Sequence, residues 1–250
     1  MAETGIRIGT AGWAIPRAVA DAFPREGSGL QRYAGCFQVV EINSTFYRPH
    51  QASTFERWAE TTPEGFRFAL KAPRAVTHEA KLAGGAAELA RFLEDGRRLG
   101  AKFAVVLVQL PPSLAFDADV AGRFFAGLRD LAPDLALACE PRHASWFEPQ
   151  PDALLAGLQV ARVAADPARH PAAAEPGGWR GFAYHRLHGS PRMYYSSYAD
   201  GRLERLAERL RAGPADSWCI FDNTASGAAA ADALQLRRRL GGRPQAAEDG

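Results

Sequence analysis

The sequence predicts an α/β protein with the fold of a single-domain TIM (β/α)8 barrel. Two observations favour this fold. Short apolar segments alternate with helical patterns along nearly the whole 250-residue chain, and a barrel of this kind typically needs about 250 residues. Several of these segments are almost continuous in Val, Leu, Ala and Phe, as parallel strands covered on both faces are. The predicted strands are residues 6–10, 38–42, 66–71, 103–109, 135–140, 159–164, 182–187 and 218–222.

Helical patterns occupy the segments between these strands. Ser53 and Glu56 have the spacing of a capping box at the start of one helix. Asp117 and Asp152 are predicted to cap two others, because an aspartate side chain accepts hydrogen bonds from the first turn of a helix. The remaining helical patterns cover residues 30–37, 86–99, 203–211 and 228–240.

A doubly wound open sheet is the alternative architecture. That fold favours a G-x-G-x-x-G turn after the first strand, whereas the chain reads G-T-A-G-W at residues 9–13, and the G-S-G at 27–29 follows no strand. The barrel is therefore the preferred prediction. No linker divides the chain, so residues 1–240 are expected to form one domain and residues 241–250 a flexible tail.

The composition is that of an ordinary soluble protein, with 47% hydrophobic and 23% charged residues. The net charge of +2 does not favour nucleic acid as a partner. The three cysteines, Cys36, Cys139 and Cys219, form no C-x-x-C pair, which favours a reducing, cytoplasmic setting over a disulfide framework. No secretory signal and no segment long enough to span a bilayer is recognised, so no membrane association is expected.

Polar residues follow the predicted strands at their C-terminal ends, where TIM barrels carry their sites. Alternate strand residues share a face, so Glu41 with Asn43 and Arg186 with His188 are expected to point into the barrel mouth, as are Glu140 and Arg142. The other candidates are Thr10, Trp13, Thr45, Lys71, Gln109, His143, Asp166, Asp222, Asn223 and Thr224.

Cationic groups outnumber acidic groups at this mouth, which predicts an anionic ligand. The cations and histidines are Lys71, Arg74, Arg142, Arg186, His78, His143 and His188, and the acids are Glu41, Glu140 and one or both of Asp166 and Asp222. The aromatic residues Trp13, Phe46, Tyr47 and Trp146 follow the same strand ends and offer walls for a ring-bearing ligand.

Two other interpretations of these charges remain. Buried ion pairs such as Glu140–Arg142 or Glu41–Lys71 would close a barrel mouth without any ligand. A divalent metal held by Glu41, Glu140, His143 and His188 is the less favoured alternative, because no local spacing supports it. The cofactor is therefore unknown from the sequence.

Seven segments together resemble the YecE-like proteins, the family known as domain of unknown function 72. These segments are G-T-A-G-W (9–13), V-E-I-N-S-T-F-Y-R (40–48), F-A-L-K-A-P-R-A-V-T-H (68–78), V-Q-L-P-P-S (108–113), E-P-R-H-A-S-W (140–146), R-L-H-G (186–189) and F-D-N-T (221–224). Their order and spacing extend from about Ile6 to Leu240.

The resemblance implies a TIM-type barrel and brings no activity with it. It maps the family's motif positions onto Glu41, Asn43, Thr45, Lys71, His78, Gln109, Glu140, Arg142, His143, Arg186, His188 and Asn223. The chain departs from the family pattern at Ala14 and Ile15, where an aromatic residue is usual, at Pro141, and at Asp222, where the family commonly has asparagine. Asp222 adds an acid to the mouth.

The leading functional hypothesis is an enzyme that acts on a small phosphorylated or carboxylated substrate. Arg142, Arg186 and Lys71 are expected to anchor the anion, and Glu140 with His143 or His188 to transfer protons, oriented by Glu41 and Asn43. The same hypothesis counts Thr45, His78, Gln109, Trp13, Trp146 and Asn223 as substrate-binding residues. The alternatives are a metal-dependent nucleic-acid phosphodiesterase and a non-catalytic binding protein for an anionic metabolite.

Overall fold

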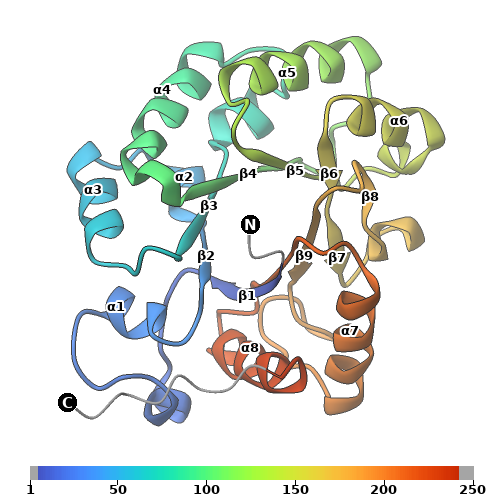
Figure 1. The fold of residues 1–250 in the computed structure, drawn as a ribbon. Helices are drawn as coiled ribbons and strands as arrows, with labels where there is room; N and C mark the ends of the chain where they lie inside the picture. Colours follow the sequence, from blue (N-terminus) through green and yellow to red (C-terminus); the bar gives the residue numbers. More distant parts are fainter. Residues whose placement is uncertain (1–4, 242–250) are drawn as a thin grey trace.

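The protein folds into a ring of parallel strands surrounded by helices (Figure 1). The structure is a computed structural model that describes residues 5–241. Its strands form one sheet in the order β7-β9-β10-β1-β2-β3-β4-β5-β6-β8, in which only the β6–β8 pair is antiparallel. The strands are β1 (Ile6–Ala11), β2 (Val39–Ile42), β3 (Arg67–Lys71), β4 (Phe103–Gln109), β5 (Ala136–Glu140), β6 (Val160–Arg162), β7 (Ala164–Asp166), β8 (Gly177–Gly178), β9 (Ala183–Leu187) and β10 (Ser217–Phe221).

The sixth predicted strand closes the barrel. It consists of β6 and β7, which are separated only by Val163. β6 pairs with β5, whereas β7 pairs with β9 at the other end of the sheet. One continuous stretch of chain therefore joins both ends of the sheet, and the predicted TIM-barrel fold is confirmed (Figure 1).

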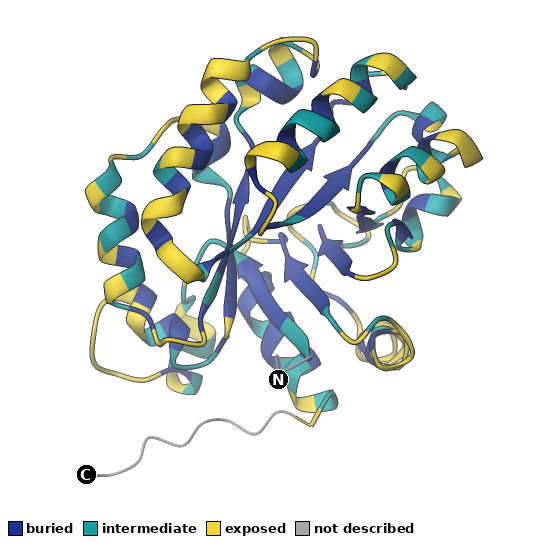
Figure 2. Ribbon diagram, turned by 45° about the horizontal axis from the view of Figure 1, so that its top comes forward, coloured by how far each residue is buried: buried dark blue, intermediate teal, exposed yellow. Residues whose placement is uncertain are grey.

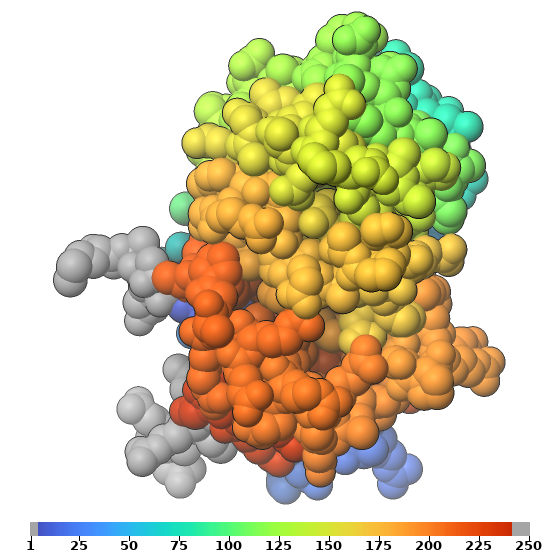
Figure 3. Space-filling view, turned by 90° about the vertical axis from the view of Figure 1, so that its right-hand side faces the viewer, coloured from blue at the N-terminus to red at the C-terminus, as the bar shows by residue number. Residues whose placement is uncertain are grey.

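The helices cover the outside of the barrel with their exposed faces toward solvent (Figure 2). On the face that Figure 3 shows, the chain runs in order from its green part at the top through yellow to orange below. The α-helices are α1 (Gly29–Ala34), α2 (Ser44–Tyr47), α3 (Ala52–Glu60), α4 (Ala86–Gly96), α5 (Ala118–Leu131), α6 (Pro149–Gly157), α7 (Asp200–Ala212) and α8 (Ala228–Arg239). Short helical turns lie at η1 (Arg17–Ala22), η2 (Ala75–Glu79), η3 (Arg97–Lys102), η4 (Ala144–Phe147) and η5 (Pro171–Ala174).

Apolar side chains form two layers. The larger one packs between the strands and the helices, and it includes Phe37, Phe68 and Phe125. The smaller one fills the interior of the barrel and includes Val105 and Trp218. Because burial of apolar surface is the main favourable term in folding, these layers hold the strands in register beneath the polar residues at the strand ends.

The helix starts agree only partly with the sequence. Asp117 caps α5 as predicted, since its carboxylate accepts a hydrogen bond from the amide of Val120 at 2.9 Å. The capping box predicted for Ser53 and Glu56 is wrong, because α3 begins one residue before Ser53 and its N-cap, Gln51, makes no side-chain cap. A capping box is found instead at α1, where Ser28 and Gln31 hydrogen-bond to each other's backbone amides.

The predicted cap at Asp152 is also wrong. α6 begins at Pro149, which places Asp152 inside the first turn. Its carboxylate accepts hydrogen bonds from the amide of Gly178 at 2.7 Å and from Nε of Arg162 at 3.1 Å. These long-range partners compete with a local cap, and they tie α6 to β6 and β8. The predicted tail, 241–250, lies outside the described residues except for Gly241.

His185 makes the stability of this fold sensitive to acid. Its side chain lies on the outer face of β9, and burial together with the nearby Arg209 lowers its pKa to about 4. The unfolded chain therefore binds a proton more readily than the folded chain between about pH 6.5 and pH 4. Stability from this group is fully present above about pH 6.5 and decreases as the pH falls, by up to about 3 kcal/mol.

We expect the His185→Leu variant to lose part of this pH dependence. Urea unfolding at a series of pH values measures it, since the free energy of unfolding should fall less steeply below about pH 6.5 in the variant than in the wild type. His78, whose pKa is also lowered to about 4, keeps some dependence in both proteins. Parallel curves for the two proteins would contradict the buried, neutral state of His185.

Candidate functional site

The inner face of the barrel changes from apolar to polar at the C-terminal ends of the strands. Alternate residues of a strand face the same side, and in six strands the inward series ends in a polar side chain. The pairs of successive inward residues are Val39 and Glu41, Ala69 and Lys71, Leu107 and Gln109, Ala138 and Glu140, Tyr184 and Arg186, and Ile220 and Asp222. The polar members form one layer above the apolar interior, at the end where TIM barrels carry their sites. This layer, together with His188 and Arg142, is called the polar layer below.

Arg186 lies at the centre of the polar layer, with none of its side chain exposed. Its Nη2 and Nε donate to Oε1 and Oε2 of Glu41 at 2.7 and 3.0 Å. Nη1 donates to Oε2 of Glu140 at 2.5 Å, and Nη2 donates to Oδ2 of Asp222 at 3.0 Å. The planar guanidinium thus joins three carboxylates from three parts of the barrel, a geometry that lysine cannot reproduce.

His188 bridges two of these carboxylates. Its Nε2 is 3.1 Å from Oε1 of Glu140, and its Nδ1 is 3.0 Å from Oδ2 of Asp222. Burial by itself would lower the pKa of His188, but the two carboxylates outweigh burial and raise its pKa above the usual value. Because both ring nitrogens face carboxylate oxygens, this geometry favours the doubly protonated, cationic form of the imidazole.

Glu140 is held in its ionised form. Besides Arg186 and His188, it accepts hydrogen bonds from Nε2 of Gln109 at 2.9 Å and from Nη2 of Arg142 at 3.0 Å. Burial alone would raise the pKa of Glu140, but Arg186, His188 and Arg142 together hold it well below the usual range. A carboxylate with so low a pKa and so many donors is a weak proton acceptor, so it supports the site rather than exchanging protons.

Every carboxylate oxygen of the polar layer has a donor. Tyr184 donates its hydroxyl to Oε2 of Glu41 at 2.8 Å, and Asn43 donates Nδ2 to Oδ1 of Asp222 at 3.2 Å. With the bonds from Arg186 and His188, no oxygen of Glu41, Glu140 or Asp222 is left without a partner. The buried Oδ1 of Asn43 has no hydrogen-bond partner among the described residues.

Lys71 is the exception among the charged groups. Its side chain is mostly buried, yet no ion pair or hydrogen bond within residues 5–241 includes its amine. The amine lies 4.1 Å from the centre of the Phe46 ring, over its face. Burial and then Arg186 lower the pKa of Lys71 to about 8, against the opposing effect of the three carboxylates. The amine therefore has unused hydrogen-bonding capacity and changes charge close to neutral pH.

His78 stands beside three cations. Burial comes first and then Lys71, Arg74 and Arg142 in lowering its pKa to about 4, which keeps the ring neutral near pH 7. Its Nδ1 is 2.9 Å from the hydroxyl of Thr77, and its ring meets Phe46 edge-on. Burial therefore accounts for the largest part of the lowered pKa of His78, and the three cations add to it.

Three predicted site residues serve the backbone instead. His143 accepts a hydrogen bond from the amide of Ser145 and caps η4. Thr45 donates its hydroxyl to the carbonyl oxygens of Ile42 and Lys71, at 2.9 and 2.8 Å. Asn223 donates to the carbonyl of Ser196 and to Asp232. Thr45 and Asn223 therefore fix the strand ends around the polar layer and direct no donor into it.

The two tryptophans that were predicted to line the ligand site pack against other aromatic side chains instead. Trp146 is 1% exposed, donates its indole N–H to the carbonyl of Leu114 and packs against Phe116. Trp13 packs edge-on against Trp58, with ring centres 5.1 Å apart. Their contacts give no support to a role as ligand walls.

Asp166 points away from the mouth. Ala161 and Val163 face the barrel interior, so the regular alternation places Asp166 on the outer face, where it pairs with Leu187 in the β7–β9 ladder. Its carboxylate forms an ion pair with Arg202 of α7. Of the two acids between which the sequence left the choice open, Asp222 therefore lies at the mouth and Asp166 does not.

The segment after His188 covers the polar layer. Tyr194 meets the His188 ring edge-on, with ring centres 5.7 Å apart, and its amide donates to the His188 carbonyl. Met193 lines a small cavity together with Glu140, Arg142 and His188. The cavity has a volume of about 10 Å³, which is room for about one water molecule. In this conformation the polar layer is almost closed.

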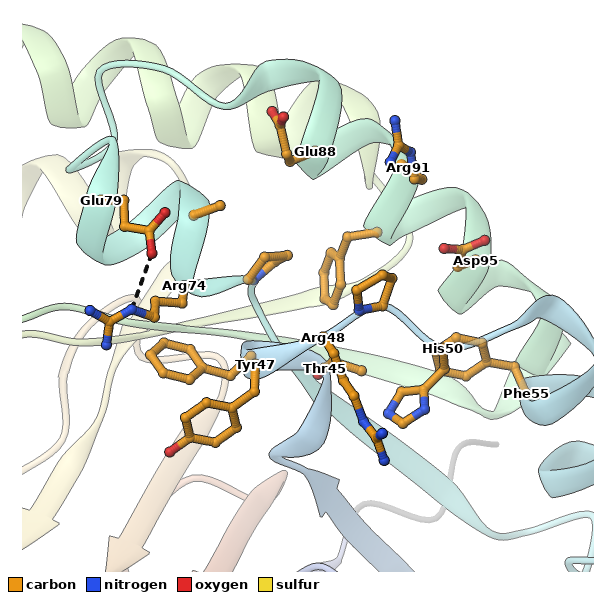
Figure 4. Close-up of a pocket in the computed structure, with 15 residues that line it drawn as sticks. Thr45, Tyr47, Arg48, His50, Phe55, Arg74, Glu79, Glu88, Arg91 and Asp95 are labelled. Atoms are coloured by element: carbon orange, nitrogen blue, oxygen red, sulfur yellow. Dashed lines mark hydrogen bonds and ion pairs between the residues drawn. The ribbon is translucent and has the colours of Figure 1, made fainter.

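A larger cavity of about 300 Å³ lies beside the mouth, between α4 and the segment that links β2 to α3 (Figure 4). Phe46 lines it and also contacts Lys71, so one ring separates the cavity from the polar layer. Arginines and acids alternate around its rim, and Arg74 pairs there with Glu79 at 3.2 Å (Figure 4). The charges of the arginines and acids on this rim balance, whereas the amine of Lys71 has no hydrogen-bond acceptor among the described residues.

The sequence reasoning missed Tyr184, which donates to Glu41 of the polar layer, and left Asp222 out of its list of ligand-binding residues. The alternation that identified Arg186 and His188 extends back to Tyr184, so the signal was present. Among residues 5–241, no group of three or more His, Cys, Asp or Glu side chains is arranged to hold a metal ion. No helix in the same range is both long and apolar enough to cross a bilayer.

Comparison with known proteins gives one consistent relationship. The family model described as "Protein of unknown function DUF72" matches residues 7–249. The chain is 28% identical to UPF0759 protein YunF of Bacillus subtilis over 156 residues, and 28% identical to UPF0759 protein YecE of Escherichia coli over 142 residues. These matches cover 58% and 57% of this chain but only 53% and 50% of those proteins, so the chain spans about half the length of the curated relatives it matches.

A solved structure shows the same architecture. The crystal structure of a DUF72 family protein from Thermotoga maritima is 25% identical and superimposes with a TM-score of 0.73. The alignment covers 95% of this chain and 99% of that one. The relatives therefore agree with the barrel described above, and their names and descriptions carry no reaction.

Proposed function

The chain belongs to the DUF72 family, whose description assigns no activity, and we propose from the site itself that the protein is an enzyme for a small anionic substrate. The substrate carries a phosphate or a carboxylate and binds at the C-terminal mouth of the barrel. Lys71 and Arg142 contact the anion, and the proton chemistry takes place beside them. The other members of the polar layer hold these two side chains in place.

The proposal rests on a comparison of hydrogen-bond donors and acceptors in the polar layer. Each oxygen of Glu41, Glu140 and Asp222 already accepts from a donor. The amine of Lys71 has no acceptor among residues 5–241. A buried charge without a partner is costly, so a bound anion is the simplest completion of the site.

The proposed proton donor is His188. Glu140 and Asp222 keep it cationic, and a positioned imidazolium is an effective general acid. Glu41 and Glu140 act as fixed negative charges. For Glu140 this differs from the proton-transfer role that the sequence suggested, whereas Glu41 was expected to orient the proton-transferring groups. Contact with His188 requires Met193 and Tyr194 to move, because the cavity beside them holds only about one water molecule.

Thermal-shift measurements test the anion site. Purified protein is heated with inorganic phosphate, phosphate esters and small carboxylates, each at a series of concentrations. A ligand present at about 100 times its dissociation constant stabilises by about 2.7 kcal/mol. For a chain of this size each kcal/mol raises Tm by roughly 2–4 °C.

We expect Arg142→Ala to reduce the ligand-induced shift sharply. Arg98→Ala is the matched control, because Arg98 pairs with Glu56 at the surface, 3.3 Å away, on the outside of the barrel. Comparing shifts rather than absolute Tm values removes any effect of Arg142→Ala on stability itself. A shift that is equal in both variants, or absent with all of these anions, would contradict the proposed function.

A further inference from the structure

Lysine is rare in this chain. Lysines and arginines together number 30, and only Lys71, Lys81 and Lys102 are lysines. Arginine stays charged under all ordinary conditions, whereas a buried lysine can lose its proton and become a nucleophile. Nearly all basic residues of this chain are arginines. Lys71, the last inward-facing residue of β3, is therefore a basic group that can lose its proton and react as an amine.

The environments of the three lysines differ. Lys81 is exposed to solvent. Lys102 donates its amine to the carbonyl oxygens of Ala59 and Thr62, each at 2.5 Å. Lys71 alone combines a mostly buried side chain with an amine that has no acceptor among the described residues. Of the two lysines that are not exposed, Lys71 is therefore the one whose amine is not held by a carbonyl oxygen.

Charged groups face Lys71 from several elements. The charged groups that act on it are Arg186 of β9, Glu41 of β2, Glu140 of β5 and Asp222 after β10. Lys71, Arg74 and Arg142 in turn all act on His78. Burial and then Arg186 outweigh the carboxylates, and the lowered pKa of about 8 leaves a substantial neutral fraction of the Lys71 amine at mildly alkaline pH. The neutral amine is the form that attacks a carbonyl carbon.

We infer that Lys71 forms an imine with the carbonyl group of a small substrate whose carboxylate or phosphate is held by Arg142 and Arg74. The inference rests on the proposed function and names its substrate class as an anionic aldehyde or ketone. Lys71 is then the catalytic nucleophile, and in the imine the anion contact proposed for its amine passes to Arg74. The guanidinium of Arg142 and the exposed guanidinium of Arg74 supply the anion contacts that arginine makes well.

The step balances without any further reactant. The lone pair of the neutral Lys71 nitrogen forms a C–N bond with the carbonyl carbon, and the π bond of the carbonyl breaks. Both amine protons end on the carbonyl oxygen, which leaves as water, and a C=N bond remains. Polar groups of the site assist the transfers, and the reaction is reversible by addition of water.

Reductive trapping tests this inference. Wild-type protein is incubated with pyruvate, and separately with pyridoxal 5′-phosphate, in the presence of cyanoborohydride. The reductant delivers a hydride to the imine carbon, which converts a transient imine into a stable secondary amine. Digestion and mass spectrometry then locate the adduct among the three lysine-containing positions. We expect Lys71 to be modified while Lys81 and Lys102 remain largely unmodified.

Two variants and a pH series test whether the adduct is specific to Lys71. Lys71→Arg keeps the positive charge and should abolish the specific adduct, whereas Lys81→Arg should leave it unchanged. The trapping rate at Lys71 should level off just above pH 8, as its pKa of about 8 requires, whereas an ordinary lysine becomes more reactive up to about pH 10. No adduct at Lys71 with either carbonyl compound, or comparable labelling of all three lysines, would overturn the inference.

The trapping result is distinguishable from a failure of the proposed function. If anions still stabilise the protein in an Arg142-dependent manner but no Lys71 adduct forms, then only the imine is excluded. If anions neither stabilise the protein nor form adducts, both proposals fail. Thermal shifts of Lys71→Arg with inorganic phosphate complete the comparison, because phosphate binds without a carbonyl group.

Discussion

Replacing Arg186 with methionine should lower the free energy of unfolding by about 3–5 kcal/mol, because it leaves a buried charge cluster without its cation. Glu41, Glu140 and Asp222 all depend on this guanidinium, which is completely buried. Methionine has a similar length, so the loss of packing is small compared with the electrostatic cost. Urea unfolding at neutral pH measures the change.

Arg98→Met is the matched control for this experiment. Arg98 and its partner Glu56 are each about half exposed, and pairs of that kind contribute about 0–1 kcal/mol. The two variants should therefore differ several-fold in their effect. An Arg186→Met variant as stable as Arg98→Met would show that the three carboxylates are solvated or protonated, contrary to the network described above.

Replacing Glu140 with glutamine should lower the pKa of His188. Glu140 is the first of the groups that raise this pKa against burial, and the amide of glutamine carries no charge. The variant should also lose stability, by about 3 kcal/mol, because Arg186, Arg142 and His188 lose a shared counter-charge. NMR titration of the histidine ring protons measures the pKa directly, since the chain has only six histidines.

The sign of the pH effect follows from the same shift. In the wild type the folded-state pKa of His188 lies above its unfolded value, so the stability it adds is present below about pH 6.5 and is lost as the pH rises through the folded pKa. In Glu140→Gln this contribution should shrink. Glu56→Gln, at the surface, should leave the His188 titration unchanged. An unchanged His188 titration in Glu140→Gln would contradict the bridge between the two residues.

Strand alternation predicted much of the polar layer. Glu41, Glu140 and Arg186 were assigned to the mouth because each ends an inward series, and the structure places them together. Alternation gives the face of a residue and not its depth or its partner. Glu41 therefore appeared suited to Lys71 on the neighbouring strand, whereas it pairs with Arg186 from across the barrel.

Depth also changes the role of Arg186. The sequence suggested that it anchors the ligand, but its three nitrogens all point to carboxylates and its side chain is sealed from solvent. The predicted pair Glu140–Arg142 does form, at 3.0 Å. The sequence shows which charged residues belong to this network. Which cations bind the carboxylates and which remain available to a ligand depends on distances in the folded protein.

Residues after a strand end were harder to place. Trp146 follows the densest polar segment of the chain, yet it folds back into the core under the loop that follows β4. Asp166 was offered as one of two acids for the mouth, but the inward alternation of Ala161 and Val163 places it on the outer face. The two-residue period therefore accounts for Asp166, whereas Trp146 lies in the helical turn η4, where that period does not apply.

A crystal structure of the protein with its most stabilising anion tests the central claim most directly. We expect density for the anion within hydrogen-bond distance of Lys71 Nζ and Arg142, with the Met193–Tyr194 segment displaced from its present position. An anion bound only in the 300 Å³ cavity beside Arg48, Arg74 and Arg91, with Lys71 still without an acceptor, would contradict the account and identify that cavity as the binding site instead.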